Sequence, residues 1–292
     1  MEKILFGEIL NHSSLYENLQ FNSKKKYSVK VIRNILFLDS YLYIDEPFKL
    51  KDLIFVLILV LLKKNALIIH NCNKWLNIKY CGKKNYYYYI KSTLRKIILN
   101  YTNEIIVVSP SLKDYLKKNN INKKISYIPF SNKKKEKKSK NNLVYSIPGA
   151  ISIKKKYDFI FELIKNTNFK VKTELYLLGI PVDEFGKSII SEVEGIKNKN
   201  LIIYTFEKRL TDAEFNSVMS NTDYIISDFN KEILTDDNYI EEYGLTKETG
   251  FCWLAKEYGC SVIGPQFYNS QHIGVKYLNL SELNTILNIN SF

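Results

Sequence analysis

Short, continuous apolar runs alternate with amphipathic stretches along most of the chain, and this alternation restricts the fold most. Runs such as ALIIH (66–70), EIIVV (104–108) and LIIY (201–204) are rich in β-branched residues and too short for helices. The stretches between them, such as 88–99 and 212–220, have the apolar spacing of helices that pack on a sheet. Apolar strands between helices are typical of a parallel sheet that helices cover, so the sequence predicts an α/β fold.

This alternation occurs twice, on either side of SNKKKEKKSKNN (131–142), which contains no apolar residue. The first set has expected strands at ILF near the start, 29–37, 66–70, 104–108 and 125–128, and helices over 50–64, over 88–99 and from Ser109-Pro110. The second set has expected strands at 143–147, 174–178, 201–204, 223–227 and 261–263, and helices over 156–166, 212–220 and FCWLAKEY. We therefore expect two Rossmann-like, doubly wound domains, 1–132 and 143–292, joined by a basic linker at 133–142.

Composition favours a cytoplasmic protein with two cores. Hydrophobic residues make up 46% of the 292 residues, and the four cysteines form no CxxC pair, which favours reduced thiols. The N-terminal MEKILFGEIL turns polar too early for a signal peptide. The longest apolar run, at 53–62, has ten residues, whereas a membrane span needs about 20. We expect no membrane-spanning helix.

A formal charge of +13 is concentrated in lysine runs at 24–26, 133–138 and 154–156. Such runs suit an anionic membrane surface or phosphate-bearing small molecules, and equally an AT-rich gene that encodes lysine wherever the surface tolerates it. Nucleic acid is not an expected partner, because lysines far outnumber arginines and no recognisable module interleaves them with aromatic residues. The helix at 50–64 suits either membrane docking or packing inside the domain, and the strand that follows directly favours the interior. The tyrosines at 86–89 suit either an acceptor or membrane rim or half-buried helix packing.

Ligands in parallel α/β sheets bind at the carboxyl ends of the strands, so residues just after the predicted strands are candidate binding residues. In the second half these are Gly149 after LVYSI, Gly179 after ELYLL, and Asp228 with Phe229 after DYIIS. A glycine at such a position lets a ligand approach the backbone closely.

The stretch EYGLTKETGFCWLAKEYGCSVIG (242–264) places Thr249 and Gly250 at the expected start of a helix. A diphosphate there would meet the positive end of the helix dipole, with Lys247 and the lysines at 154–156 as counter-charge. Tyr243 and Glu248 lie in the same loop and are candidates for contacting a sugar. The alternative is that Thr249 is only an N-cap and Gly250 only a packing contact.

Several common motifs are absent from the sequence. There is no GxGxxG, no GxxxxGK[ST] and no Asp-x-Asp, and the three histidines, His12, His70 and His272, have no metal-ligand spacing. The sequence therefore predicts neither a protein-bound metal nor a separate cofactor.

Together these segments, from about residue 66 to 264, resemble the glycosyltransferases of the GT-B fold, group 1 type, whose two domains face each other across a cleft. PGAISIKKK aligns Gly149 and Lys155 with that group's glycine and diphosphate-contacting lysine, although Ala150 stands where many relatives carry arginine. RLTDAEFNSVMSNTDYIISDF resembles the helix and strand element that Asp223 opens, and GFCWLAKEYGCSVIG resembles the segment that closes the donor site.

The chain departs from the group at one motif. Many members carry two glutamates with seven residues between them, and these positions fall on Thr246 and Leu254. Thr249-Gly250 instead match a subgroup with Ser-Gly or Thr-Gly at the helix start. In the first half, LIIHNC resembles the strand whose His-Asn end faces the cleft, which implies a catalytic or sugar-contacting role for His70, with Asn71 beside it.

The resemblance implies transfer of a sugar from a nucleotide-diphosphate donor to a glycan or lipid-linked acceptor, in bacterial surface polysaccharide synthesis. It favours retention of configuration. The alternative is a catalytically degenerate GT-B domain that acts as a partner subunit, which the missing glutamates and Ala150 would fit.

Overall fold

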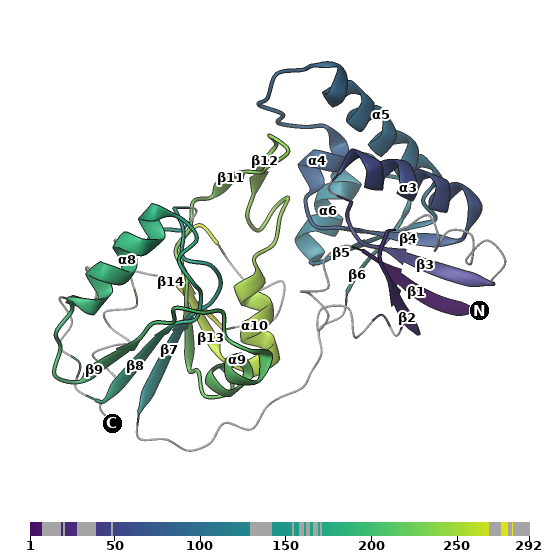
Figure 1. Ribbon diagram of the computed structural model, residues 1–292. Helices are drawn as coiled ribbons and strands as arrows, with labels where there is room; N and C mark the ends of the chain where they lie inside the picture. Colours follow the sequence, from purple (N-terminus) through teal and green to yellow (C-terminus); the bar gives the residue numbers. More distant parts are fainter. Residues whose placement is uncertain are drawn as a thin grey trace. The chain divides into compact units, whose positions relative to one another are not determined.

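The computed structural model describes residues 1–7, 19, 21–27, 39–47, 49–128, 142–153, 155–157, 161, 164–165, 169, 171–268, 276–279 and 282 (Figure 1). The chain forms two compact units. Unit 1 is Met1–Phe130 with Glu232–Glu248, and unit 2 is Ser131–Lys231 with Thr249–Phe292. Unlike the expected domains 1–132 and 143–292, the two units group Glu232–Glu248 with the first half of the chain.

Unit 1 contains a parallel six-stranded sheet of order β2-β1-β3-β4-β5-β6. Its strands are β1 (Glu2–Phe6), β2 (Ser23–Lys25), β3 (Ser40–Ile44), β4 (Asn65–Ile69), β5 (Glu104–Val107) and β6 (Lys124–Tyr127), and its helices are α3 (Leu50–Leu62), α4 (Cys72–Leu76), α5 (Tyr86–Tyr101) and α6 (Pro110–Lys118). All five residues of β4 are buried, as its continuous apolar run predicts, and α6 begins after the N-cap residue Ser109. The strand expected at 29–37 lies outside the described residues.

Unit 2 contains a second parallel six-stranded sheet, of order β14-β13-β10-β7-β8-β9. Its strands are β7 (Leu143–Ile147), β8 (Thr173–Leu177), β9 (Leu201–Tyr204), β10 (Tyr224–Ile226), β13 (Ser261–Gly264) and β14 (Tyr277–Asn279), and its helices are α8 (Glu184–Glu194), α9 (Asp212–Met219) and α10 (Gly250–Tyr258). Helix α8 was not expected from the sequence; it starts where the Asp183 side chain accepts a hydrogen bond from Gly186 N at 2.7 Å. The linker and most of the helix expected at 156–166 lie outside the described residues.

Each sheet has a point at which the order of its strands reverses. In unit 2, β7, β8 and β9 follow one another outward, and β10 then pairs on the other side of β7. In unit 1, β1 pairs with β2 on one side and with β3 on the other. Such switch points open a crevice at the carboxyl ends of the two strands, where α/β proteins bind ligands. The residues after β7 and β10, and after β1 and β3, are therefore the first places to look for a site.

The segment Glu232–Glu248 is an antiparallel hairpin of β11 (Glu232–Leu234) and β12 (Ile240–Glu242) with the loop that follows it. Its backbone is hydrogen-bonded to unit 1: Ile240 N donates to Lys79 O, and Cys72 N donates to Thr246 O at 2.9 Å. Cys81 N also donates to Asn238 O at 2.9 Å. These partners explain why the segment belongs to unit 1, because buried backbone groups are paired in folded proteins.

Helix α3 has one buried stripe and one exposed apolar stripe. Leu53, Val56 and Leu59 are buried, whereas Ile54, Ile58 and Leu61 on another stripe are exposed. The helix therefore contributes to the core of unit 1 and also presents apolar surface. No helix in the described parts of the chain is long and apolar enough to cross a bilayer.

Candidate functional site

The loop after β7, at the switch point of unit 2, is built around Gly149 and Lys155. Gly149 has a φ of +84°, a conformation that side chains rarely adopt, and it is exposed. The ammonium of Lys155 folds back over the loop and donates to Pro148 O at 2.5 Å. A side-chain carbon on Gly149 would lie 3.1 Å from Lys155 Nζ. Gly149 and Lys155, two of the four residues predicted to contact phosphate, therefore lie side by side.

Lys155 is an unusual lysine because its charge is only partly hydrated. Burial lowers its pKa from 10.5 to about 8. Within the described residues no carboxylate lies within ion-pair distance of its ammonium. A largely desolvated cation that is hydrogen-bonded to a carbonyl and lacks a counter-ion has a strong tendency to attract an anion.

Gly179 lies against this loop and packs it. A side-chain carbon at Gly179 would come within 2.0 Å of Gly149 O, so only glycine lets the loops after β7 and β8 meet. Ile151 N also donates to Ile180 O at 3.0 Å, which joins the same two loops. The structure thus gives Gly179 a packing role, and ligand contact by this residue stays a prediction.

Asp228 and Phe229 follow β10, on the other side of the switch point. Asp228 O accepts a hydrogen bond from Lys156 N at 3.2 Å, which ties the end of β10 to the loop that carries Lys155. Burial raises the pKa of the Asp228 carboxyl, and the charge of Lys156 partly opposes this effect. The buried ring of Phe229 contacts Phe251 in the first turn of α10, with ring centroids 5.3 Å apart.

Helix α10 begins at this edge of the sheet. Thr249 is its buried N-cap residue and Gly250 its exposed first residue, as the sequence predicted. A side-chain carbon built on Gly250 would meet no atom within 4 Å, so packing does not explain this glycine. The first turn of α10 is open to a ligand at its positive end.

The other predicted donor residues group with unit 1. Tyr243, Lys247 and Glu248 belong to the segment that packs into unit 1, whereas the residues above belong to unit 2. Lys247 donates through Nζ to Asn71 Oδ1 at 2.7 Å, and Asn71 Nδ2 donates to Glu46 Oε2 at 3.3 Å. Burial lowers the pKa of Lys247 and raises that of the Tyr243 hydroxyl. Asn71 and Lys247 are therefore engaged with each other inside unit 1.

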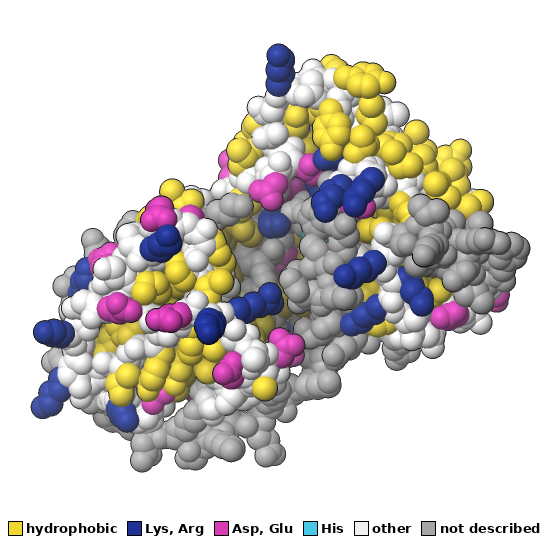
Figure 2. Space-filling view, viewed as in Figure 1, with side chains coloured by type: hydrophobic (Ala, Val, Ile, Leu, Met, Phe, Trp, Pro, Cys, Tyr) yellow, Lys and Arg dark blue, Asp and Glu magenta, His cyan; other side chains and the backbone are white. Residues whose placement is uncertain are grey.

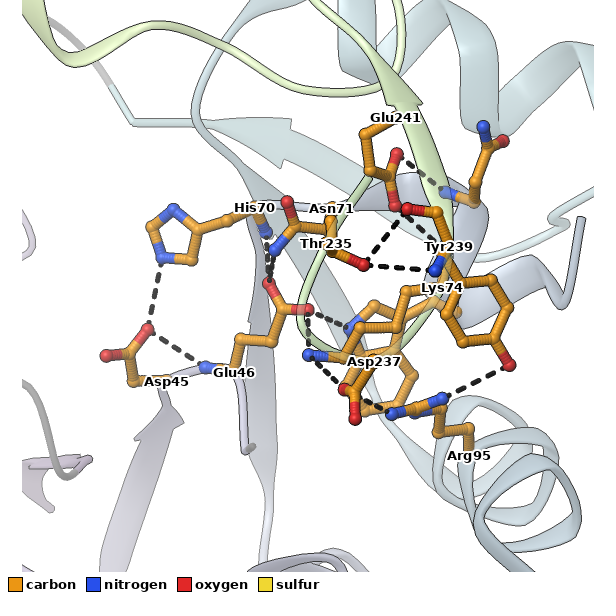
Figure 3. A network of polar contacts seen from close by, with 12 residues as sticks. Asp45, Glu46, His70, Asn71, Lys74, Arg95, Thr235, Asp237, Tyr239 and Glu241 are labelled. Atoms are coloured by element: carbon orange, nitrogen blue, oxygen red, sulfur yellow. Dashed lines mark hydrogen bonds and ion pairs between the residues drawn. The ribbon is translucent and has the colours of Figure 1, made fainter. Parts of the chain in front are cut away.

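His70 follows β4 and pairs with Asp45, which follows the neighbouring strand β3. Its Nε2 lies 3.1 Å from Asp45 Oδ1, and its side chain remains 22% exposed (Figure 3). A carboxylate only accepts hydrogen bonds, so Nε2 carries a proton and Nδ1 is the basic nitrogen. Such a pair orients an imidazole, and an oriented imidazole can act as a general base.

Glu46, next to Asp45, anchors this part of unit 1. Its carboxylate accepts from His70 N at 2.9 Å and from Trp75 Nε1 at 3.2 Å, and it forms an ion pair with Lys74 at 3.0 Å (Figure 3). Burial alone would raise the pKa of Glu46, but the charges of Lys74 and His70 hold it below its ordinary value. The backbone of His70 is thereby fixed.

The hairpin supplies the remaining acids of this network. Glu241 is buried and accepts from Lys74 N at 3.0 Å and from Asn73 N at 3.2 Å, at the start of α4. Burial raises the pKa of its carboxyl to about 7, against the effect of these hydrogen bonds. Asp237 pairs with Lys91 at 2.6 Å and with Arg95 at 2.9 Å.

Sequence reasoning missed Asp45, Glu46, Lys74, Asp237 and Glu241. The rule that polar residues after a strand mark a site would have found Asp45 and Glu46, had the alternating run SYLYI before them been taken as a strand. No comparable signal marks Asp237 or Glu241, because their partners are more than 140 positions away. His12 and His272 lie outside the described residues, and within those residues no three His, Cys, Asp or Glu side chains are grouped to hold a metal ion.

The two α/β units, each with a parallel six-stranded sheet, match the structures of GT-B glycosyltransferases. The chain is similar in structure to HepE of Anabaena in complex with UDP and glucose, with a TM-score of 0.58 and 11% identity over 99% of this chain and 89% of that one. It is also similar to a UDP-forming trehalose-phosphate synthase from Burkholderia xenovorans, with a TM-score of 0.52 and 9% identity over 95% of this chain and 68% of that one.

A further similar structure is TarM, with a TM-score of 0.50 and 11% identity over 89% of this chain. The chain spans only 49% of TarM. A scan against family models and a search of curated proteins found no match. The structural likeness shows that the chain has the GT-B fold.

Proposed function

We propose that the chain transfers a glycosyl group from a nucleoside-diphosphate sugar to a glycan or lipid-linked acceptor, without a metal ion. The observation that carries this proposal is the setting of Lys155: a partly buried ammonium without a carboxylate partner in the described chain, beside the positive-φ Gly149 at the switch point of unit 2. The complexes of HepE with UDP and with UDP-glucose support a nucleotide-sugar donor.

Unit 2 has the chemistry that a diphosphate leaving group needs. In glycosyl transfer the bond from the anomeric carbon to the diphosphate oxygen breaks, and the leaving group takes the electron pair and gains negative charge. Lys155, the backbone around Gly149 and the first turn of α10 at Thr249 and Gly250 would stabilise that charge. These groups replace the counter-charge that a divalent cation supplies in metal-dependent enzymes.

In unit 1 the proposal assigns the acceptor side of the reaction to His70. The acceptor hydroxyl forms the new bond to the anomeric carbon and loses its proton, which Nδ1 of His70 can take while Asp45 stabilises the resulting charge. A hydrogen bond from His70 to the transferred sugar is the other role that this position suits. We propose that the acceptor hydroxyl attacks from the face that the diphosphate leaves, so that the configuration is retained. We also propose that the acceptor belongs to bacterial surface polysaccharide synthesis.

A binding screen tests the donor site directly. The purified chain is heated with UDP, GDP, CDP, TDP and ADP and their common sugar conjugates, without added metal. A ligand that binds only the folded state stabilises it by about 2.7 kcal/mol at a hundredfold excess over Kd, which raises Tm. We expect one nucleotide to raise Tm, and Lys155→Ala to abolish that rise.

Lys187→Ala is the matched control, because Lys187 is an exposed lysine of α8 in the same unit. It is expected to leave the nucleotide-dependent rise in Tm unchanged. A rise that survives in Lys155→Ala contradicts the assignment of Lys155. No rise with any nucleotide favours the alternative that the chain is a degenerate partner subunit, which the absence of donor hydrolysis would support.

A further inference from the structure

Helix α3 presents an apolar stripe to solvent. Ile54, Ile58 and Leu61 are spaced three and four residues apart, so they lie on one side of the helix, and Leu62 continues the stripe. Leu61 and Leu62 are 52% and 51% exposed, and Ile54 is 48% exposed. Four large aliphatic side chains of this 13-residue helix are in contact with water. Packing in the core does not explain them, because the opposite stripe of the helix faces the core.

Helix α5 extends this surface. It packs beside α3, and its first turns expose Tyr86, Tyr87 and Tyr89. Apolar side chains gather over the two helices on the side of unit 1 visible in Figure 2. We call this surface, made of Ile54, Ile58, Leu61, Leu62, Tyr86, Tyr87 and Tyr89, the α3–α5 face.

Lysines surround the α3–α5 face, and exposed acids are absent from both helices. Lys51 and Lys64 flank the stripe of α3, and Lys83 and Lys84 precede α5; all four are exposed. The one acidic residue of these two helices, Asp52, is buried. The surface therefore combines aliphatic residues, tyrosines and positive charge.

We propose that the α3–α5 face docks on an anionic lipid surface. An amphipathic helix lies in the interface of a bilayer with its aliphatic stripe among the acyl chains, tyrosines at the headgroup level and lysines near the anionic headgroups. The cores of protein interfaces, in contrast, are depleted of lysine. Lysines at both ends of the stripe fit lipid better than a second copy of this chain, which would bring the same lysines toward one another.

Flotation of the full chain with vesicles tests the proposal. Vesicles of phosphatidylcholine alone and of phosphatidylcholine with phosphatidylglycerol are compared at low and high salt. We expect the chain to float with the anionic vesicles and to dissociate at high salt, because screening weakens the attraction of lysines to the headgroups.

Two variants separate the apolar and electrostatic contributions. Ile58→Ser/Leu61→Ser is expected to reduce partition into anionic vesicles by about tenfold, because it removes buried apolar surface. Lys83→Gln/Lys84→Gln is expected to reduce it by about tenfold on anionic vesicles only. All four positions are exposed, so the variants keep the fold, which their unchanged Tm verifies.

Val182→Ser and Lys187→Gln, at exposed positions of unit 2, serve as controls and are expected to float like the unaltered chain. The proposal is overturned if the chain does not float with either vesicle, if it floats equally with both, or if the face variants float as the controls do. It is also overturned if the chain sediments as a dimer that Ile58→Ser/Leu61→Ser converts to a monomer, since a second copy then covers the face.

Discussion

Lys155 is the residue whose environment links structure to function most directly. It has a pKa of about 8 and can attract an anion only while it is protonated. Between pH 7 and pH 9 the protonated fraction of such a lysine falls from about nine-tenths to about one-tenth. We therefore expect Kd for the bound nucleotide to rise by about tenfold over this range, as calorimetric titration would measure.

Lys155→Arg gives the control for this pH dependence, because a guanidinium stays charged throughout the range. If arginine fits, nucleotide affinity becomes constant between pH 7 and pH 9. The same pH dependence in Lys155→Ala would show that another group titrates.

His70 is expected to act on turnover and not on donor binding. In Asp45→Asn the amide can donate to the imidazole, so the proton moves to Nδ1 and the base is lost. We expect His70→Gln and Asp45→Asn each to lower donor hydrolysis or transfer by about 10²- to 10⁴-fold, with nucleotide Kd unchanged. Asp39→Asn, at an exposed aspartate of the same unit, should leave both quantities unchanged. A parallel loss of nucleotide affinity would contradict the role of a base.

At the scale of elements, the hairpin of β11 and β12 makes the stability of unit 1 depend on pH. The carboxyl of Glu241 has an ordinary pKa of 4.5 and a pKa of about 7 in the folded chain. The folded state therefore holds more protons between these values, and the stability from this proton is present below pH 4.5 and lost as the pH rises through 7. A shift of this size corresponds to roughly 3 kcal/mol.

We expect the free energy of unfolding of unit 1 to fall more steeply from pH 5 to pH 8 in the natural chain than in Glu241→Gln. Urea denaturation of both chains at several pH values measures this difference. The contributions of the other titrating groups are the same in both chains and cancel. Glu46 and Asp237, whose pKa values are lowered despite their burial, titrate below this range. Glu232→Gln, at an exposed glutamate of the same hairpin, should follow the natural chain. Identical slopes for Glu241→Gln and the natural chain would show that Glu241 is charged throughout.

At the scale of the whole molecule, the sequence predicted the structural features that depend on residues close together in the chain. Both parallel sheets, the start of α6 at Ser109-Pro110 and the position of Thr249 and Gly250 at the start of α10 follow from local patterns of apolar residues, serine, proline and glycine. Strand β3 was missed because its buried residues alternate with half-exposed tyrosines. The place of Tyr243 and Lys247 in unit 1 was also missed, because it depends on contacts between residues far apart in the chain.

The hairpin also sets the order in which the units can mature during translation. Residues Met1–Phe130 leave the ribosome first, but Glu232–Glu248 follow only after about 100 more residues have been added. At about 5–20 residues per second this interval lasts on the order of 10 s. Throughout it, Arg95 and Lys91 lack the carboxylate of Asp237, and the start of α4 lacks that of Glu241. The unit whose synthesis begins first therefore reaches its final state only when most of the other unit has already been translated.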